Sequence, residues 1–282
     1  MLKQRIITAL VLLAILLPAL FYPGSHVPFA CIMLAMIAAA GWEWGRLNGY
    51  GPRMALFIGF EALALCVLSW VLGLLEVRLT GLWIVAGAAW VLVGGALLKV
   101  AVPGWPRIPK PLRLVGGLLA LWVAWLAVVQ ARMIGVNFLL SILVLVWVAD
   151  VFAYFAGRAF GLKFTRNKLA PAISPGKSWE GVWGGMIGVL VLAFAWVWAD
   201  RAAGALVPSL YSHLAGRGWW LLVLGALFLA AMSVVGDLVE SLIKRSAGAK
   251  DSSQLLPGHG GVLDRVDALL PTLPLAMMLA SL

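Results

Sequence analysis

Long apolar runs alternate with short polar connections along the whole chain. A membrane-spanning helix needs about 20 mostly apolar residues, with a tolerated range of roughly 17 to 25. Runs near this length occupy residues 6–22, 27–42, 54–75, 82–98, 114–129, 133–149, 182–199, 219–236 and 268–282. Because a backbone in lipid must satisfy its own hydrogen bonds, the pattern predicts an all-α polytopic membrane protein with about nine transmembrane helices.

The first and last of these runs are the least regular. Lys3 and Arg5 precede a short apolar run, as in a secretory signal, but no clean small-x-small cleavage site follows and the chain stays apolar afterwards. We therefore interpret 6–22 as a retained span. Pro271 and Pro274 interrupt the final run, so this is the weakest of the predicted spans.

Composition supports the membrane interpretation. Hydrophobic residues form 63% of the chain and charged residues 11%, against about 25% charged residues in a soluble globular protein. We expect a single membrane domain over residues 1–282. Its first part, 1–132, consists of transmembrane helices, and its second part, 133–282, is a catalytic region with two polar loops at 150–181 and 237–267.

The net charge of +10 is unevenly distributed, and this indicates topology. Of the 21 Lys and Arg residues, 17 lie in alternate connections, namely 1–5, 43–53, 99–113, 150–181 and 237–267. Since basic residues are retained in the cytoplasm, the N-terminus and both long loops should face the cytoplasm, and the C-terminus should face outward. The charge therefore gives no reason to expect a nucleic-acid partner.

The loop at 150–181 carries the first group of candidate residues. Asp150, Tyr154 and Arg158 are spaced so that a continuing helix would place them on one face. A turn rich in Pro and Gly follows, and such a turn can present amide and ammonium groups to a phosphate. Its candidate substrate-binding residues are Ser174, Lys177 and Ser178. An ordinary cytoplasmic loop with common turn residues fits the composition equally well.

The loop at 237–267 holds five of the eleven acidic residues and begins where an apolar run ends. Charges at a membrane edge are costly and tend to mark function. Asp237, Ser241, Lys244 and Arg245 are spaced to share one face of an extended eighth helix, and the pair Asp264 and Asp267 stands at the entrance to the last run. If the two helix ends are neighbours, Asp237 and Asp264 can approach a common cation. The segment between them supplies Lys250, Asp251, His259 and the glycines Gly258, Gly260 and Gly261.

Several of these residues also have simpler interpretations. Lys244 and Arg245 can extend to lipid headgroups without any catalytic role, and Asp264 with Arg265 can form a surface ion pair. His259 can be a turn residue. Glu43 is interpreted as interfacial. The joint pattern favours a functional site over these separate explanations.

The segment 241–267, SLIKRSAGAKDSSQLLPGHGGVLDRVD, resembles the signature of phosphatidate cytidylyltransferases, also called CDP-diacylglycerol synthases. The resemblance consists of a Ser, a Lys-Arg pair, a Lys-Asp pair, His-Gly-Gly and Asp-Arg-x-Asp at set intervals. The upstream stretch KLAPAISPGKSWEG is also similar to that family. The first half of the chain resembles it only in being apolar spans.

This resemblance implies an enzyme that transfers a cytidylyl group from CTP to phosphatidate, giving CDP-diacylglycerol and pyrophosphate. Together with the charge distribution, it leads us to expect a bacterial inner membrane location with the active site facing the cytoplasm. By charge type we expect Asp237 and Asp264 to bind Mg²⁺, with Asp267 as a further ligand or a residue just behind them. Further expected catalytic residues are Lys244, Arg245, Lys250, Asp251, His259 and Arg265; Ser241, Gly260 and Gly261 join the loop residues named above in binding substrate. Glycine pairs in the spans permit close helix contact, within the chain or in a homodimer.

Three alternatives remain at this point. A cytidylyltransferase for another lipid phosphate would carry the same residues. The CDP-alcohol phosphatidyltransferases are a second enzyme class, but their DGxxAR motif is absent from the sequence. A transporter or channel would place charges through the bilayer, whereas most acidic residues here gather at helix ends on one side.

Overall fold

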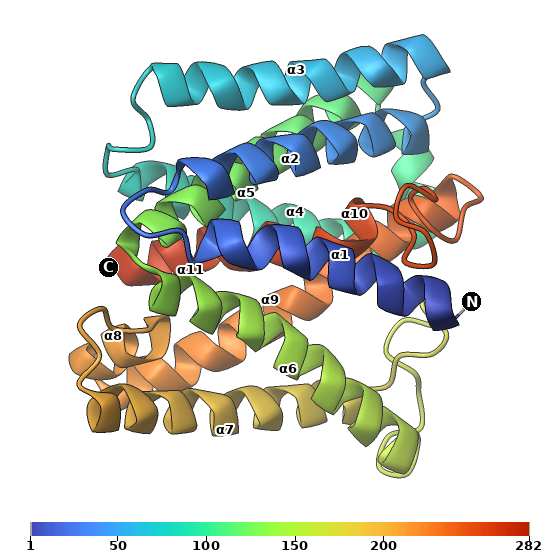
Figure 1. The fold of residues 1–282 in the computed structure, drawn as a ribbon. Coiled ribbons are helices and arrows are strands. Elements are labelled where there is room, and N and C mark those ends of the chain that lie inside the picture. Colours follow the sequence, from blue (N-terminus) through green and yellow to red (C-terminus); the bar gives the residue numbers. More distant parts are fainter. Residues whose placement is uncertain (1, 282) are drawn as a thin grey trace.

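The computed structural model describes residues 2–281, and helices form nearly all of the fold (Figure 1). Within this range no β-strand is formed. The helices are α1 (Leu2–Leu20), α2 (Val27–Leu47), α3 (Pro52–Val71), α4 (Thr80–Gly104), the 3₁₀ turn η1 (Trp105–Arg107), α5 (Lys110–Ile134), α6 (Val136–Phe160), α7 (Trp179–Ala203), α8 (Leu210–Arg217), α9 (Trp219–Ser246), α10 (Leu263–Val266) and α11 (Leu269–Ser281). The predicted all-α polytopic class is confirmed.

The number of membrane-crossing helices differs from the expected nine. Over the described residues, seven helices are long and apolar enough to cross a membrane, namely α2, α3, α4 with η1, α5, α6, α7 and α9. In α1 the qualifying apolar stretch, Gln4–Leu20, is shorter than these. α11 has 13 residues, which at about 1.5 Å per residue is shorter than a bilayer core of about 30 Å. The count of nine is therefore not confirmed.

The N-terminus and both long loops lie at one end of the helical bundle, and the C-terminus lies at the other (Figure 1). At the loop end, Thr8 Oγ1 donates a hydrogen bond to Pro257 O at 2.9 Å. At the opposite end, Arg132 Nε donates to Leu20 O at 2.7 Å. The arrangement matches the alternation of basic and non-basic connections in the sequence.

The connection after α7 contains a short helix that the hydropathy pattern did not predict. Asp200 Oδ2 accepts hydrogen bonds from Ser209 Oγ and Ser212 Oγ, each at 2.6 Å, so the carboxylate holds the first turn of α8. His213 Nε2 lies 2.9 Å from Ala280 O and ties α8 to the end of α11. This short helix thus closes the end of the bundle away from the long loops.

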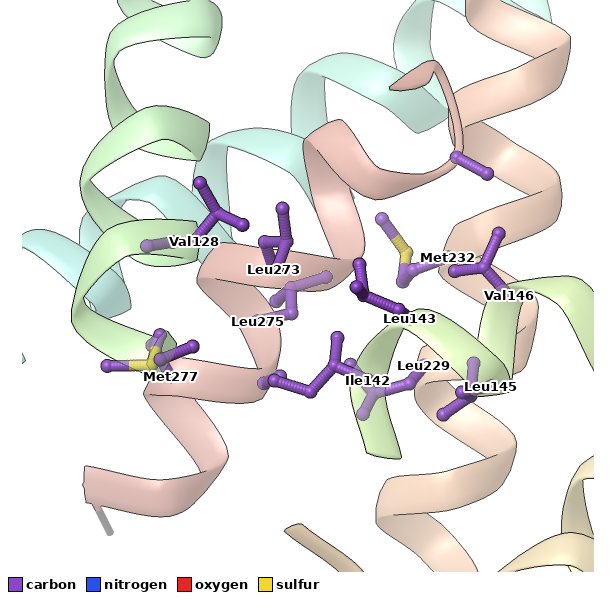
Figure 2. Packing of buried hydrophobic residues seen from close by; sticks show 14 of the residues in the cluster. Val128, Ile142, Leu143, Leu145, Val146, Leu229, Met232, Leu273, Leu275 and Met277 are labelled. Carbon is purple, nitrogen blue, oxygen red and sulfur yellow. The ribbon is translucent and has the colours of Figure 1, made fainter. Parts of the chain in front are cut away.

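α11 forms the centre of the core. It packs against α4, α5 and α9, and its residues 271–277 are buried. Leu273, Leu275 and Met277 meet side chains of α5, α6 and α9 in one apolar cluster (Figure 2). Because this short helix is enclosed on several sides, its backbone is kept away from lipid. Asp267 comes just before its first residue, Leu269, and so lies where the chain enters the bundle.

α6 and α7 pack closely through small residues. A Cβ atom added to Gly184 would lie 2.2 Å from Ala156 Cβ, and one added to Gly188 would lie 2.4 Å from the Phe152 ring. The close contact expected at the Gly184–Gly185 pair is therefore made within the chain, against α6. It brings the end of α6 against the start of α7, where the first long loop begins and ends.

Candidate active site

The end of α9 packs directly on the entrance to α11. A Cβ atom on Gly236 would lie 2.5 Å from Asp267 O and 2.8 Å from Pro271 Cγ, so only glycine permits this approach. Asp237 follows immediately on α9. The two charged helix ends are therefore neighbours, which is the condition on which the expected common cation site depended.

Asp237 joins the two long loops. Its Oδ2 atom lies 2.5 Å from Lys177 Nζ, and its Oδ1 atom accepts a hydrogen bond from Ser241 Oγ at 3.2 Å. Ser241 stands one turn further along α9, on the face that the sequence predicted. Lys177, which we expected to bind substrate, thus belongs to the same cluster as the aspartates of the second loop.

A polar cavity of about 540 Å³ opens beside this ion pair, between α6, α7 and α9. Asp150, Tyr154 and Arg158 line it from α6, and Lys177 and Asp237 line it from the other side. Arg158 Nη1 donates a hydrogen bond to Tyr154 Oη at 3.2 Å. The predicted helical face of α6 is confirmed, and it points into a space that presents two cations and two carboxylates.

Lys244 connects α9 to the second loop. Its Nζ atom lies 2.5 Å from Asp264 Oδ1 and also forms an ion pair with Glu240, one turn earlier on α9. Asp264 Oδ2 accepts hydrogen bonds from Ser252 N at 2.9 Å, Ser252 Oγ at 2.8 Å and Gly261 N at 2.8 Å. Burial alone would raise the pKa of Asp264, but the hydrogen bonds from Lys244, Gly261 and Ser252 lower it to about 2.

Asp267 has the opposite electrostatic environment. Burial, together with the negative charge of Asp237, raises the pKa of Asp267 to about 7. Its Oδ1 atom accepts a hydrogen bond from Ala268 N at 2.8 Å. A second negative charge beside Asp237 is therefore unfavourable at this buried position.

The donor set suits a hard cation, although no ready-made metal site is formed by three His, Cys, Asp or Glu side chains within residues 2–281. Asp237, Asp264 and Asp267 offer carboxylate oxygens, which Mg²⁺ prefers. Lys177 and Lys244 already place cationic groups against two of these carboxylates. The cluster therefore already binds cationic groups through its carboxylates, and a further cation near Asp237 and Asp267 would favour the charged form of Asp267.

Other expected site residues lie around this cluster with different contacts. Arg245, Lys250 and Asp251 are exposed, and Arg245 Nη1 donates to Ala249 O at 3.3 Å. Arg265 is also exposed, and its Nε atom donates to His259 O at 3.0 Å. These exposed groups can be reached by a soluble polyanion, and they are not part of the buried network around Asp264.

Three residues expected to bind substrate have clear structural roles. Ser178 is the N-cap of α7, since its Oγ atom accepts a hydrogen bond from Gly181 N at 3.2 Å. Ser174 belongs to the preceding turn, in which its carbonyl accepts from Lys177 N. Gly260 has a φ of +83°, and a Cβ there would lie 2.7 Å from Asp264 Oδ2, so this position requires glycine.

Glu43 was expected only to lie near a loop at the membrane interface, and its contacts were not predicted. This residue of α2 is fully buried, and it accepts hydrogen bonds from residues 252, 253, 262 and 263 of the second loop. Glu180 was not expected in the site either. Its Oε1 atom accepts hydrogen bonds from Phe164 N and Thr165 N and so holds the first loop. In the sequence, each of the two is a single acidic residue close to tryptophan residues at the end of an apolar run, and this pattern is only a weak indication of a structural role.

An apolar cavity of about 430 Å³ lies on another side of α9, between α2, α4 and α5. Glu240 lines it from α9, and Trp44, Trp105 and Arg113 line the part near the charged end of the bundle. Gly236 also lines it, whereas Asp237, the next residue, lines the polar cavity. One helix therefore separates a polar space from an apolar one at the level of the charged cluster.

The fold and this cluster define a class: a polytopic helical membrane protein with a carboxylate and lysine site at one end of the bundle. The sequence pattern of the cytidylyltransferase family matches residues 3–282. This chain belongs to the cytidylyltransferase family, which confirms the resemblance noted in the sequence.

The matches to similar proteins cover nearly the whole chain. The phosphatidate cytidylyltransferase of Pseudomonas aeruginosa is 40% identical, covering 97% of this chain and 95% of the relative. That of Haemophilus influenzae is 37% identical, covering 97% and 96%. That of Brucella abortus is 38% identical, covering 95% and 89%. The first half of the chain, which resembled the family only in its apolar spans, is included in these matches.

Proposed function

We propose that this protein transfers a cytidylyl group from CTP to phosphatidate and forms CDP-diacylglycerol and pyrophosphate. The observation that carries the proposal is the contact between Lys177 and Asp237, which joins both polar loops beside a polar cavity. The family membership and the names of the similar proteins support it. A reaction between two polyanions needs cationic groups, and Lys177, Arg158 and Lys244 supply them here.

In the proposed reaction the phosphate of phosphatidate is the nucleophile. Its oxygen forms a bond to the α-phosphorus of CTP while the bond from that phosphorus to the bridging oxygen of the β-phosphate breaks, and pyrophosphate leaves. The lipid phosphate is anionic near neutral pH, so the reaction requires no strong protein base. The protein must hold the two substrates in line and neutralise their charge.

The residues of the cluster divide this work. Lys177 and Arg158 face the polar cavity and would bind CTP phosphates there. Lys244, held by Asp264, would neutralise charge near the lipid phosphate. The exposed cations Arg245, Lys250 and Arg265 would attract the nucleotide at the entrance. Asp251 and His259 would shape the same entrance.

Asp237, Asp264 and Asp267 would hold Mg²⁺, and Asp237 also lines the polar cavity. A bound Mg²⁺ supplies further neutralisation of the nucleotide phosphates. In that arrangement Asp264 also keeps the second loop in place through Ser252 and Gly261.

The two cavities beside α9 suit substrates of different solubility. The polar cavity would receive CTP, and the apolar cavity would receive an acyl chain of the lipid. Both lie near the basic end of the bundle, which we place on the cytoplasmic side of a bacterial inner membrane. Neither substrate then has to cross the bilayer.

The proposal is tested with purified protein, phosphatidate, Mg²⁺ and CTP labelled in either of two positions. Cytidylyl transfer carries label into the lipid fraction from α-labelled CTP and not from γ-labelled CTP. Lipid labelling from the γ position would indicate a phosphoryl transfer and would refute the proposal. Replacing phosphatidate by an isoprenoid ether lipid phosphate tests the nearest alternative, which predicts faster turnover of that lipid.

A further inference from the structure

Glu43 is a buried carboxyl group that the mechanism above does not use. It lies near the end of α2, in the first half of the chain, and its side chain is fully buried. Its hydrogen-bond donors come from the second polar loop and the start of α10, 209 to 220 residues later. A group this remote in sequence from the loop therefore fixes the loop's position against α2.

The two oxygens of Glu43 have matched partners. Oε1 accepts from Val262 N at 2.9 Å and from Ser253 Oγ at 2.5 Å. Oε2 accepts from Leu263 N at 2.7 Å and from Ser252 Oγ at 3.2 Å. A buried charge is costly unless it is well hydrogen-bonded, and this carboxylate receives one backbone N–H on each oxygen and has one serine hydroxyl beside each.

The contacts continue into the proposed active site. Ser252 Oγ also lies 2.8 Å from Asp264 Oδ2, and its single hydrogen can be given to only one of the two carboxylates at a time. Ser252 N donates to the same oxygen of Asp264. Asp264 in turn holds Lys244 on α9. An unbroken series of polar contacts thus runs from α2 through the loop to the lysine.

We propose that Glu43 is a positioning residue for the reaction: it fixes the 252–263 segment from α2 and thereby sets Asp264 and Lys244. This inference rests on the proposed function. The residues that line the polar cavity do not include Glu43 or its four partners. Loss of the Glu43 contacts should therefore lower turnover more than it weakens CTP binding in that cavity.

The decisive comparison is Glu43→Gln against Glu43→Asp. Gln keeps the size of the side chain, but whichever way its amide turns, the NH₂ group faces a backbone N–H, either of Val262 or of Leu263. Asp is smaller but keeps the charge and two acceptor oxygens. A role in accepting these hydrogen bonds ranks Asp above Gln in activity, whereas a role in filling space ranks Gln above Asp.

We expect Glu43→Gln to lower kcat by about tenfold to a hundredfold, as for other groups that orient a reactive carboxylate, with a smaller change in the KM for CTP. Glu43→Asp should retain more activity than Gln. The matched control is Glu61→Gln in α3, an exposed side chain with no hydrogen bond or ion pair to the described residues, and this variant should keep the wild-type kcat. Equal activity of Glu43→Gln and wild type, or Gln above Asp, overturns the proposal.

A second measurement does not depend on catalysis. Hydrogen exchange in detergent should be faster in Glu43→Gln over residues 252–263 and unchanged in α6 and α7; unchanged exchange over the loop overturns the proposal. If wild type produces no labelled lipid, the proposed function fails while this measurement still decides the contact role of Glu43.

Should Glu43→Gln fail to fold, Ser253→Ala removes one donor without adding a conflicting group. It should lower kcat by about threefold to tenfold, and a wild-type kcat in that variant also overturns the proposal.

Discussion

Lys177 and Asp237 are 60 residues apart in the chain, yet Nζ of the lysine lies 2.5 Å from Oδ2 of the aspartate. The lysine comes from the turn before α7, and the aspartate comes from α9. Both side chains are partly exposed and line the same polar cavity. This contact makes the two loops one site, and it leaves the lysine within reach of a nucleotide that enters the cavity.

Replacing Lys177 by Met should raise the KM for CTP. Because a hydrogen bond to a charged group contributes about 1.5–3 kcal/mol, we expect kcat/KM to fall by about tenfold to a hundredfold. Steady-state assays over a range of CTP concentrations measure the effect. Lys163→Met is the matched control, since Lys163 belongs to the same loop but does not line the cavity, and its kcat/KM should equal that of wild type. A Lys177→Met variant with unchanged kinetics would contradict the proposed role.

Much of the fold could be predicted because hydropathy and helical spacing are local properties. The extension of the eighth apolar run into a polar face was expected, and α9 does continue to Ser246. The short helix α8 was missed because Asp200 and its hydroxyl partners stabilise it, and these contacts are not visible in a hydropathy pattern. The count of nine spans was not reached because a run of apolar residues does not say whether a helix crosses the bilayer or is enclosed by the bundle, as α11 is.

The site was predictable to the extent that its residues share one loop or one helical face. Asp237, Ser241 and Lys244 fall on one face of α9 as their spacing required. Glu43 could not be recognised in this way. Its role depends on two backbone N–H groups about 219 residues away, and only the folded chain brings those groups to α2.

Removing divalent cations should abolish turnover. Excess EDTA is expected to stop formation of labelled lipid, and Mg²⁺ added beyond the chelator should restore it, because the proposed reaction uses a cation held by Asp237, Asp264 and Asp267. Asp267→Asn should raise the Mg²⁺ concentration needed for half-maximal activity by about tenfold or more. Glu76→Gln, an exposed residue in the turn between α3 and α4, is the control and should leave the Mg²⁺ dependence unchanged. Full activity in EDTA would exclude a metal requirement.

Filling the apolar cavity should affect the lipid substrate and not the nucleotide. Ala120 on α5 lines this cavity, and Ala120→Phe would occupy space proposed for an acyl chain. Each CH₂ group of an acyl chain that is excluded from the cavity loses about 0.8 kcal/mol of burial, so exclusion of about two groups should raise the KM for phosphatidate by about tenfold while the KM for CTP stays constant. Assays in mixed micelles at varied phosphatidate content measure both constants. Ala195→Phe, on an exposed part of α7 outside both cavities, is the control. An equal rise in both KM values would indicate general damage to the site.

Gly261 has no space for a side chain, and this gives a prediction about stability and activity together. A Cβ atom there would lie 2.1 Å from Ser252 Oγ and 2.3 Å from Glu43 Oε1, between the two groups that hold the second loop. The N–H of Gly261 also donates to Asp264 Oδ2 at 2.8 Å, so a displaced backbone would disturb that carboxylate as well. Gly261→Ala should therefore lower the free energy of unfolding by about 1–3 kcal/mol.

The same substitution should lower turnover by more than this loss of stability explains, because the displaced groups belong to the network that leads to Lys244. Thermal unfolding in detergent gives the change in Tm, and turnover measured well below that Tm gives the catalytic loss. Gly95→Ala in α4 is the matched control: nothing lies within 4 Å of the added Cβ, and Ala favours a helix over Gly. Its Tm should be equal to or above that of wild type. If Gly261→Ala keeps both the Tm and the turnover of wild type, the loop tolerates movement at this point and the close packing around Glu43 does not control the site.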